Sequence, residues 1–178
     1  MFVVVAAVAL IVVLCGFYLS WRATRLDRLH RRVDTSRAAL EAALARRGVA
    51  VLALADTEGC DPAVSRALVD AVEATDGAGE DERELAESAL SGLLRKTLED
   101  KESSFLAKTL LAEVADAAKE VHMARTFHND AVAHTRRARR SPLVRILRLA
   151  GRAPLPDFFE IDDEPPRLLS VPMDTDPR

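Results

Sequence analysis

The chain contains few aromatic residues: one Trp, one Tyr and six Phe among 178 residues, or 4%. Strands are usually enriched in aromatic side chains, whereas this sequence is rich in Ala and Leu and has 30% charged residues. Such a composition is typical of long helices. We therefore predict an all-α protein.

Cysteines and recognisable reactive motifs are also scarce. Cys15 and Cys60 stand in an apolar run and in a turn-like segment, which argues against a disulfide framework. The sequence has no His-Glu-x-x-His, no Cys-x-x-Cys, no glycine-rich phosphate loop and no nucleophile set against a base on a sharp turn. The net charge of −3 argues against a nucleic-acid partner. We expect no catalytic, cofactor-binding or metal-binding residue, and an enzyme remains a distant alternative.

Residues 1–21 contain no charged side chain, which is about the length of helix that crosses ~30 Å of hydrocarbon. Tyr18 and Trp21 close this run, where aromatic rings favour the headgroup level, and with Arg22 they mark the membrane boundary. The arginines that follow predict a single-pass protein of the cell membrane, N-terminus outside and body in the cytoplasm. A cleaved signal peptide is the alternative, but its basic start is missing. The five arginines are Arg22, Arg25, Arg28, Arg31 and Arg32.

Residues 22–153 have the apolar spacing of a long antiparallel bundle of three to four helices. No Pro or Gly interrupts the first helix before Gly48, so the membrane helix should continue into it. Asp61 and Pro62 predict the N-cap and first residue of a second helix. The first helix presents Leu26, Leu29, Val33, Leu40, Leu44, Val51 and Leu54, and the third Leu85, Leu90, Leu93, Leu94 and Leu98.

A fourth helix is predicted from about Ser103 to Ser141-Pro142. The first and fourth helices would be roughly 50 and 57 Å long, and the two middle helices laid end to end roughly 48 Å. These lengths favour a first helix leading away from the membrane, a middle pair returning and a fourth helix running outward again. The fourth helix presents Ala107, Leu110, Val114, Ala117, Val121, Ala124, His128 and Ala131 on its packed side.

Two C-terminal segments complete the chain. The basic amphipathic segment 136–152 could bind a membrane surface or, in its part from 142, fold back over the end of the bundle. A solvated helix end is the plainer interpretation of its arginines. Residues 154–178 are acidic and contain prolines, and we expect them to dock through Phe158-Phe159 and then to be disordered.

His128-Asn129-Asp130 could suggest a reactive centre. The three side chains should point in directions about 100° apart, with only His128 on the packed side. His122, His128 and His134 are six residues apart, whereas helical metal ligands are typically four apart. We therefore predict a structural role for the trio, with Asn129 facing Arg46 or Arg47 and Asp130 facing water.

Two stretches resemble the LemA family of bacterial membrane-anchored helical proteins. The stretch 33–47, VDTSRAALEAALARR, resembles the family's first-helix pattern, and 124–132, ARTFHNDAV, resembles its Arg-x-x-Tyr-Asn-x-x-Val signature with a His where Tyr is usual. The run Val49–Leu54 departs from the family's Asp-Leu-Ile-Pro-Asn-Leu, and Arg37 replaces a usual Trp. The resemblance implies a helical bundle on one N-terminal anchor. The residues that carry it are Val33, Asp34, Leu44, Arg46, Arg47, Arg125, His128, Asn129 and Val132.

These observations predict a membrane-anchored interaction or scaffold protein. Its expected partners are the lipid bilayer, through residues 1–21, and a protein that the sequence does not identify; self-association is a further option. The alternative function is binding to a membrane surface through segment 136–152.

Overall fold

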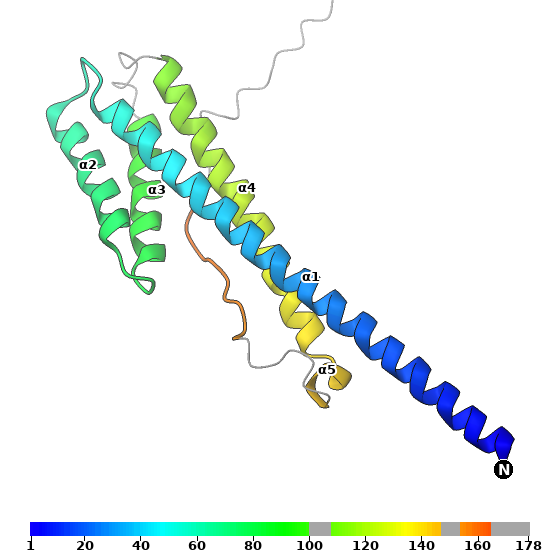
Figure 1. The fold of residues 1–178 in the computed structure, drawn as a ribbon. Coiled ribbons are helices and arrows are strands. Elements are labelled where there is room, and N and C mark those ends of the chain that lie inside the picture. Colours follow the sequence, from blue (N-terminus) through cyan, green and yellow to red (C-terminus); the bar gives the residue numbers. More distant parts are fainter. Residues whose placement is uncertain (100–107, 147–153, 165–178) are drawn as a thin grey trace, which may run out of the picture. The chain divides into compact units, whose positions relative to one another are not determined.

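The computed structural model describes residues 1–99, 108–146 and 154–164. Within these ranges the regular structure consists of five helices and contains no strand, which confirms the all-α prediction. Figure 1 labels the helices. They are α1 (Phe2–Ala55), α2 (Pro62–Gly77), α3 (Arg83–Glu99), α4 (Lys108–Arg139) and α5 (Pro142–Ile146).

The apolar N-terminal run continues into the bundle as one helix. α1 is unbroken from Phe2 to Ala55, as predicted from the lack of Pro and Gly between Leu26 and Gly48. Its first two dozen residues are almost all exposed, including Val3 at 82% and Phe17 at 76%. This part of α1 is long and apolar enough to cross a membrane.

The turn after α1 ends one helix and begins the next. Gly59 adopts φ +95°, a left-handed conformation that glycine accepts without steric cost. The Asp61 carboxylate then accepts hydrogen bonds from the backbone N–H of Ala63 (2.7 Å) and Val64 (3.3 Å). Pro62 occupies the first helical position, where it has no N–H to leave unpaired. The predicted N-cap is confirmed.

The chain divides into two compact units, and α1 and α4 contribute to both. We call residues 1–37 with 127–158 the anchor unit, and residues 38–126 with 159–178 the bundle unit. The predicted boundary at residue 21 separates segments by composition. The division by contacts instead runs across the middle of α1 and α4.

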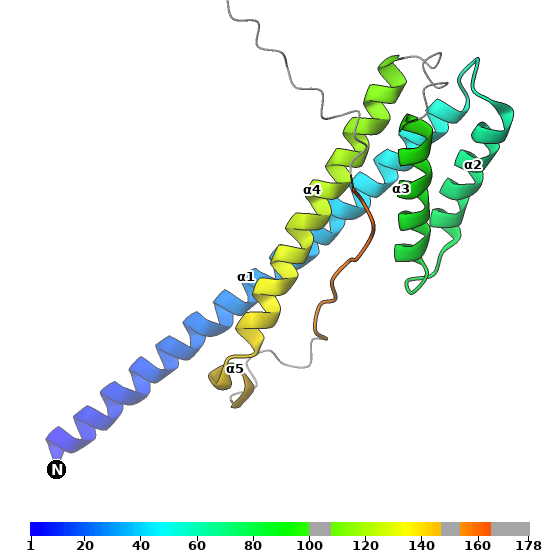
Figure 2. The same ribbon diagram turned by 180° about the vertical axis from the view of Figure 1, so that it is seen from behind.

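The bundle unit holds the larger core. α2 and α3 pack side by side as a helical hairpin, as both views show (Figures 1 and 2). Leu85, expected on the packed side of α3, is 75% exposed, because it lies five residues before Leu90 and hence about 140° around the helix. The buried residues of the main cluster are Val51, Leu54, Ala55, Leu68, Val72, Leu90, Leu94, Leu98 and Val114.

The anchor unit has a thinner core, in which Val33 of α1 packs against Ala131 and Val132 of α4. Thr135 is fully buried, and its hydroxyl lies 2.9 Å from the Ala131 carbonyl oxygen and 3.4 Å from that of Leu29. Small and β-branched residues allow the two helices to approach closely here. α5 adds the buried side chain of Val144.

α4 runs antiparallel to α1, so the predicted outward direction of the fourth helix was wrong. In the anchor unit, Arg22 of α1 donates to the Ser141 hydroxyl (3.0 Å), whereas Arg32, further along α1, pairs with the earlier Asp130 (3.4 Å). The error came from laying α2 and α3 end to end. Because they form a hairpin instead, Leu110 near the start of α4 packs against the cluster that contains Leu54 near the end of α1.

Candidate peptide-binding groove

An extended segment, residues 159–164, lies across the bundle unit, and we call it the strap. Its side chains alternate in the manner of a strand. Ile161 and Asp163 are each 8% exposed, and Phe159 is half-buried, whereas the residues between them are exposed. Ile161 and Phe159 join a cluster formed by Leu40, Ala43, Leu44 and Val121. Of the predicted Phe158-Phe159 pair, Phe159 docks here, and the docked region extends further, to Asp163. Phe158 belongs to the anchor unit, where it is 37% exposed and its ring centroid lies 4.8 Å from the Arg136 guanidinium. The disorder predicted for the end of the tail concerns residues 165–178, which lie outside the described residues.

Near the end of the strap, the buried carboxylate of Asp163 is bound by an arginine. Arg125 of α4 donates to both oxygens of Asp163, from Nε (2.6 Å) and from a terminal nitrogen (2.8 Å). Nδ1 of His122, one turn earlier on α4, lies 3.2 Å from the same carboxylate. Two-point binding by a guanidinium fixes both the position and the orientation of a carboxylate.

A second arginine holds the neighbouring carboxylate from α3. Arg95 contacts both oxygens of Asp162, at 2.9 and 2.5 Å, and the backbone carbonyl of Glu164 at 3.3 Å. The hydrogen bond from Arg95 lowers the pKa of the Asp162 carboxyl below its ordinary value. Two adjacent aspartates thus engage two different helices.

α3 also binds the backbone of the strap. The amide N–H of Glu160 donates to the Glu84 carboxylate (2.9 Å), and that of Asp162 donates to the Ser88 hydroxyl (3.1 Å). The contacts therefore combine main-chain hydrogen bonds with burial of alternate side chains, as in other modes of extended-peptide recognition. We call the surface of α1, α3 and α4 that makes these contacts the groove.

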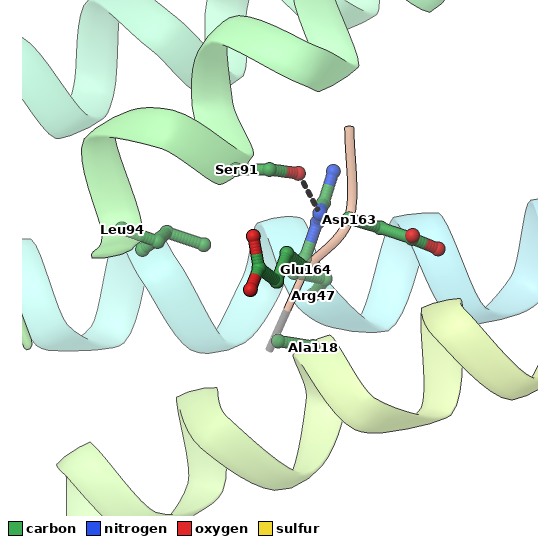
Figure 3. Close-up of a pocket in the computed structure, with 6 residues that line it drawn as sticks. All are labelled: Arg47, Ser91, Leu94, Ala118, Asp163 and Glu164. Carbon is green, nitrogen blue, oxygen red and sulfur yellow. Dashed lines mark hydrogen bonds between the residues drawn. The ribbon is translucent and has the colours of Figure 1, made fainter. Parts of the chain in front are cut away.

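A buried ion pair lies beside the groove. Arg47 of α1 is 1% exposed, contacts the Glu87 carboxylate of α3 and donates to the Ser91 hydroxyl (2.8 Å). Figure 3 shows Arg47 and Ser91 together with Ala118 of α4 and the end of the strap. The cavity between them, of about 10 Å³, holds at most about one water molecule, so it is too small for an organic substrate.

The predicted trio separates as expected from the helical geometry. His128 is 4% exposed and lies 3.3 Å from the Ser36 hydroxyl through Nδ1. Asp130 is exposed and pairs with Arg32 and, at 3.4 Å, with His134. Asn129 is half-buried and has an interaction partner.

The arginines proposed as neighbours of Asn129 have other partners. Arg46 donates to the Glu120 carboxylate (3.0 Å). Arg47 forms a salt bridge with Glu87 and donates to the Ser91 hydroxyl. The prediction did not consider the acidic residues of α3 and α4, whose charged carboxylates can form salt bridges with a guanidinium. The sequence gives no direct sign of these pairings, since Glu87 is one of many glutamates.

The remaining predicted positions are distributed between the two units. In the anchor unit, the Tyr18 and Trp21 rings lie 6.3 Å apart between centroids, and the Arg22 guanidinium lies 5.9 Å from the Tyr18 centroid. Asp34 is exposed on α1. His122, His128 and His134 each face a different partner, and among the described residues no three His, Cys, Asp or Glu are grouped as a metal site.

Sequence reasoning missed the α3 side of the groove, since no prediction named Arg95, Glu84 or Ser88. The α1 and α4 sides were predicted in part: Leu40, Leu44 and Val121 as packed residues, and Arg125 through the family resemblance. The available signal was the strap itself, because Phe-Glu-Ile-Asp-Asp alternates apolar and acidic residues over the last part of a chain otherwise expected to be disordered.

Comparisons of the chain with protein-family models, with curated proteins and with solved structures find no match.

Proposed function

We propose that the protein is a membrane-anchored, non-enzymatic interaction protein of the LemA type, and that the groove binds an extended acidic peptide of a partner protein. The observation that carries this proposal is the strap, which already occupies the groove. Its pattern, apolar-x-apolar-Asp-Asp, defines the chemistry of the partner peptide: two apolar anchors followed by two carboxylates for Arg95 and Arg125.

The two stretches that resemble the LemA family support the same assignment, because they pack against each other. Val33 lies in one cluster with Val132, and Leu44 lies in another with Val121 and Ala124. The unbroken α1 supports a single membrane anchor. The arginines after Trp21 favour a cytoplasmic body in the cell membrane, with the N-terminus outside.

A peptide-binding experiment tests the groove. The full-length chain in detergent, with I161S and D163N to weaken the strap, should bind a fluorescent peptide of the sequence PDFFEIDDE, measured by anisotropy. The parent chain should bind it more weakly, because the strap competes intramolecularly at a high effective concentration. A peptide with both aspartates replaced by asparagine is the control for charge. Equal, negligible binding to both chains while their helix content is unchanged would contradict the proposal.

The orientation is tested separately. A protease added to intact cells should leave the region after Trp21 uncut if that region is cytoplasmic. Digestion of this region without breakage of the membrane would contradict the proposed topology.

A further inference from the structure

The two units have opposite charge. The anchor unit contains 13 arginines and 4 acidic residues, a formal net charge of +9. The bundle unit contains 12 lysines and arginines and 24 acidic residues, a net charge of −12. The total of −3 therefore conceals a strongly basic region that includes the membrane span.

The fold brings basic residues from two distant parts of the sequence to one place in the anchor unit. The contact between Arg22 and Ser141 holds the junction of α4 and α5 against α1, one residue after Trp21. Several exposed arginines lie within six residues of this contact, or about 9 Å along a helix axis. We call them the arginine collar: Arg25 and Arg28 of α1, Arg137 of α4, Arg140 and Arg145.

The acidic residues of the anchor unit leave the collar uncompensated. Asp130 is engaged by Arg32 and His134, and Asp157 by Arg136. Asp27 lies four residues before Arg31, and Asp34 lies three residues after it. At these helical spacings the two carboxylates can screen the charge of Arg31, so Arg31 is not counted in the collar. Within the part of the chain that the structure describes, no collar arginine forms a salt bridge.

We propose that the arginine collar binds the headgroups of anionic phospholipids at the leaflet where α1 leaves the bilayer. The inference rests on the membrane-anchored part of the proposed function and is independent of the groove, which belongs to the other unit. A guanidinium offers several donors to a phosphate, and it gains from a negative surface potential only within about one Debye length, ~8 Å at physiological salt. The helical rise places Arg25 about 6 Å and Arg28 about 10 Å beyond Trp21, so the α1 part of the collar begins inside this range and ends close to its limit.

The full-length chain supplies its own probe, because Trp21 is the only tryptophan. The chain is reconstituted in phosphatidylcholine vesicles that contain increasing fractions of brominated phosphatidylglycerol or, for comparison, brominated phosphatidylcholine. Bromine quenches nearby tryptophan fluorescence. We expect the anionic lipid to reach half-maximal quenching at a lower mole fraction, and 0.5 M salt to abolish most of this preference.

Two variants test whether the preference for anionic lipid comes from the collar or from the total charge of the chain. R137Q/R140Q removes charge far from Trp21 in sequence but near it in the fold, and should weaken the preference for phosphatidylglycerol by about fivefold or more. R66Q, at an exposed position of α2 in the bundle unit, should leave the preference unchanged.

The outcomes distinguish the collar from the anchor. Equal quenching by the two brominated lipids, an unchanged preference in R137Q/R140Q, or an equal loss in R66Q would each overturn the collar. Absence of quenching by either lipid would instead show that Trp21 is not at a membrane, which would overturn the anchor and with it the collar.

Discussion

The two units use the same pair of helices for different purposes. In the bundle unit, α1 and α4 are joined by α2 and α3, and leucines from α1, α2 and α3 meet in one cluster. In the anchor unit, the same two helices meet over Val33, Ala131 and Val132, with the polar Thr135 and His128 also buried. The comparison indicates that most of the folding stability resides in the bundle unit.

The pairing of charged side chains also differs between the two units. Several arginines of the bundle unit are paired with carboxylates: Arg47 with Glu87, Arg46 with Glu120, Arg125 with Asp163. In the anchor unit, most arginines remain exposed, and their excess over acids is itself the feature available for binding. A buried pair stabilises a fold only while both members are present, whereas an exposed cluster can be changed at little cost to stability.

The largest predicted effect concerns the buried ion pair of the bundle unit. Replacing Arg47 by Ala should lower the free energy of unfolding by about 3–5 kcal/mol, because Glu87 would be left charged and buried. The matched change in the anchor unit, Arg32→Ala, breaks a pair whose side chains are 56% and 50% exposed and should cost at most about 1 kcal/mol. Chemical denaturation of the full chain in detergent, followed by circular dichroism, measures both.

The double variant R47M/E87L sharpens this prediction. Apolar replacement of both members of a buried pair is often neutral, and Nε of Arg47 is buried without a hydrogen-bond partner in the described structure. We expect the double variant to be much more stable than Arg47→Ala. If it is equally unstable, the pair contributes through specific hydrogen bonds, to the Ser91 hydroxyl and the Glu87 backbone carbonyl, rather than through charge compensation.

The second prediction tests the core of the bundle unit. Leu90 is 1% exposed, and Leu90→Ala should cost about 2–5 kcal/mol through lost burial and the cavity that remains. Leu85→Ala, on the same helix but at a 75% exposed site, should change stability by within about 0.5 kcal/mol. Similar losses in the two variants would show that Leu85 is packed, as its sequence spacing first suggested.

Local features of the fold followed from the sequence, because they depend on neighbours along the chain. The unbroken α1 follows from the absence of Pro and Gly between Leu26 and Gly48, and the start of α2 from Asp61-Pro62. The direction of α4 did not follow, because end-to-end and hairpin arrangements of α2 and α3 use the same apolar residues. Only the long-range packing of α2 against α3 distinguishes them.

The candidate site was less predictable for a related reason. Arg125 was singled out, but its partner Asp163 lies 38 residues away and is one of several acids near the C-terminus. Which of these acids is buried depends on how the strap docks, with Ile161 packed in the cluster that contains Leu44 and Val121. Such pairings are decided by the three-dimensional register of the strap, which spacing along the sequence does not define.

The third prediction tests the polar interface of the anchor unit. Asn129 is half-buried and engaged, so Asn129→Ala should cost about 1–3 kcal/mol by leaving its partner unpaired. Asp130→Ala should cost within about 0.5 kcal/mol, because that carboxylate is half-exposed. Thermal unfolding of the two variants provides the measurement. An Asn129→Ala variant that melts like the parent would show that the interface does not depend on this amide.

The smallest predicted effect concerns an exposed carboxylate of the strap. Arg95 lowers the pKa of Asp162 in the folded chain, so the ionised form is favoured by folding. The contribution of this contact is therefore present above the unfolded pKa, near 3.8, and is lost as the pH falls through the lower folded value.

NMR titration of the Asp162 carboxyl carbon should give a pKa below 3.8 in the parent and a value near 3.8 in the Arg95→Gln variant. Because the carboxylate is exposed, the melting temperature at neutral pH should barely differ between the two chains. A parent pKa at or above 3.8 would mean that Arg95 does not hold Asp162 in solution, and that the strap is retained by its other contacts, through Phe159, Ile161, Asp163 and the backbone.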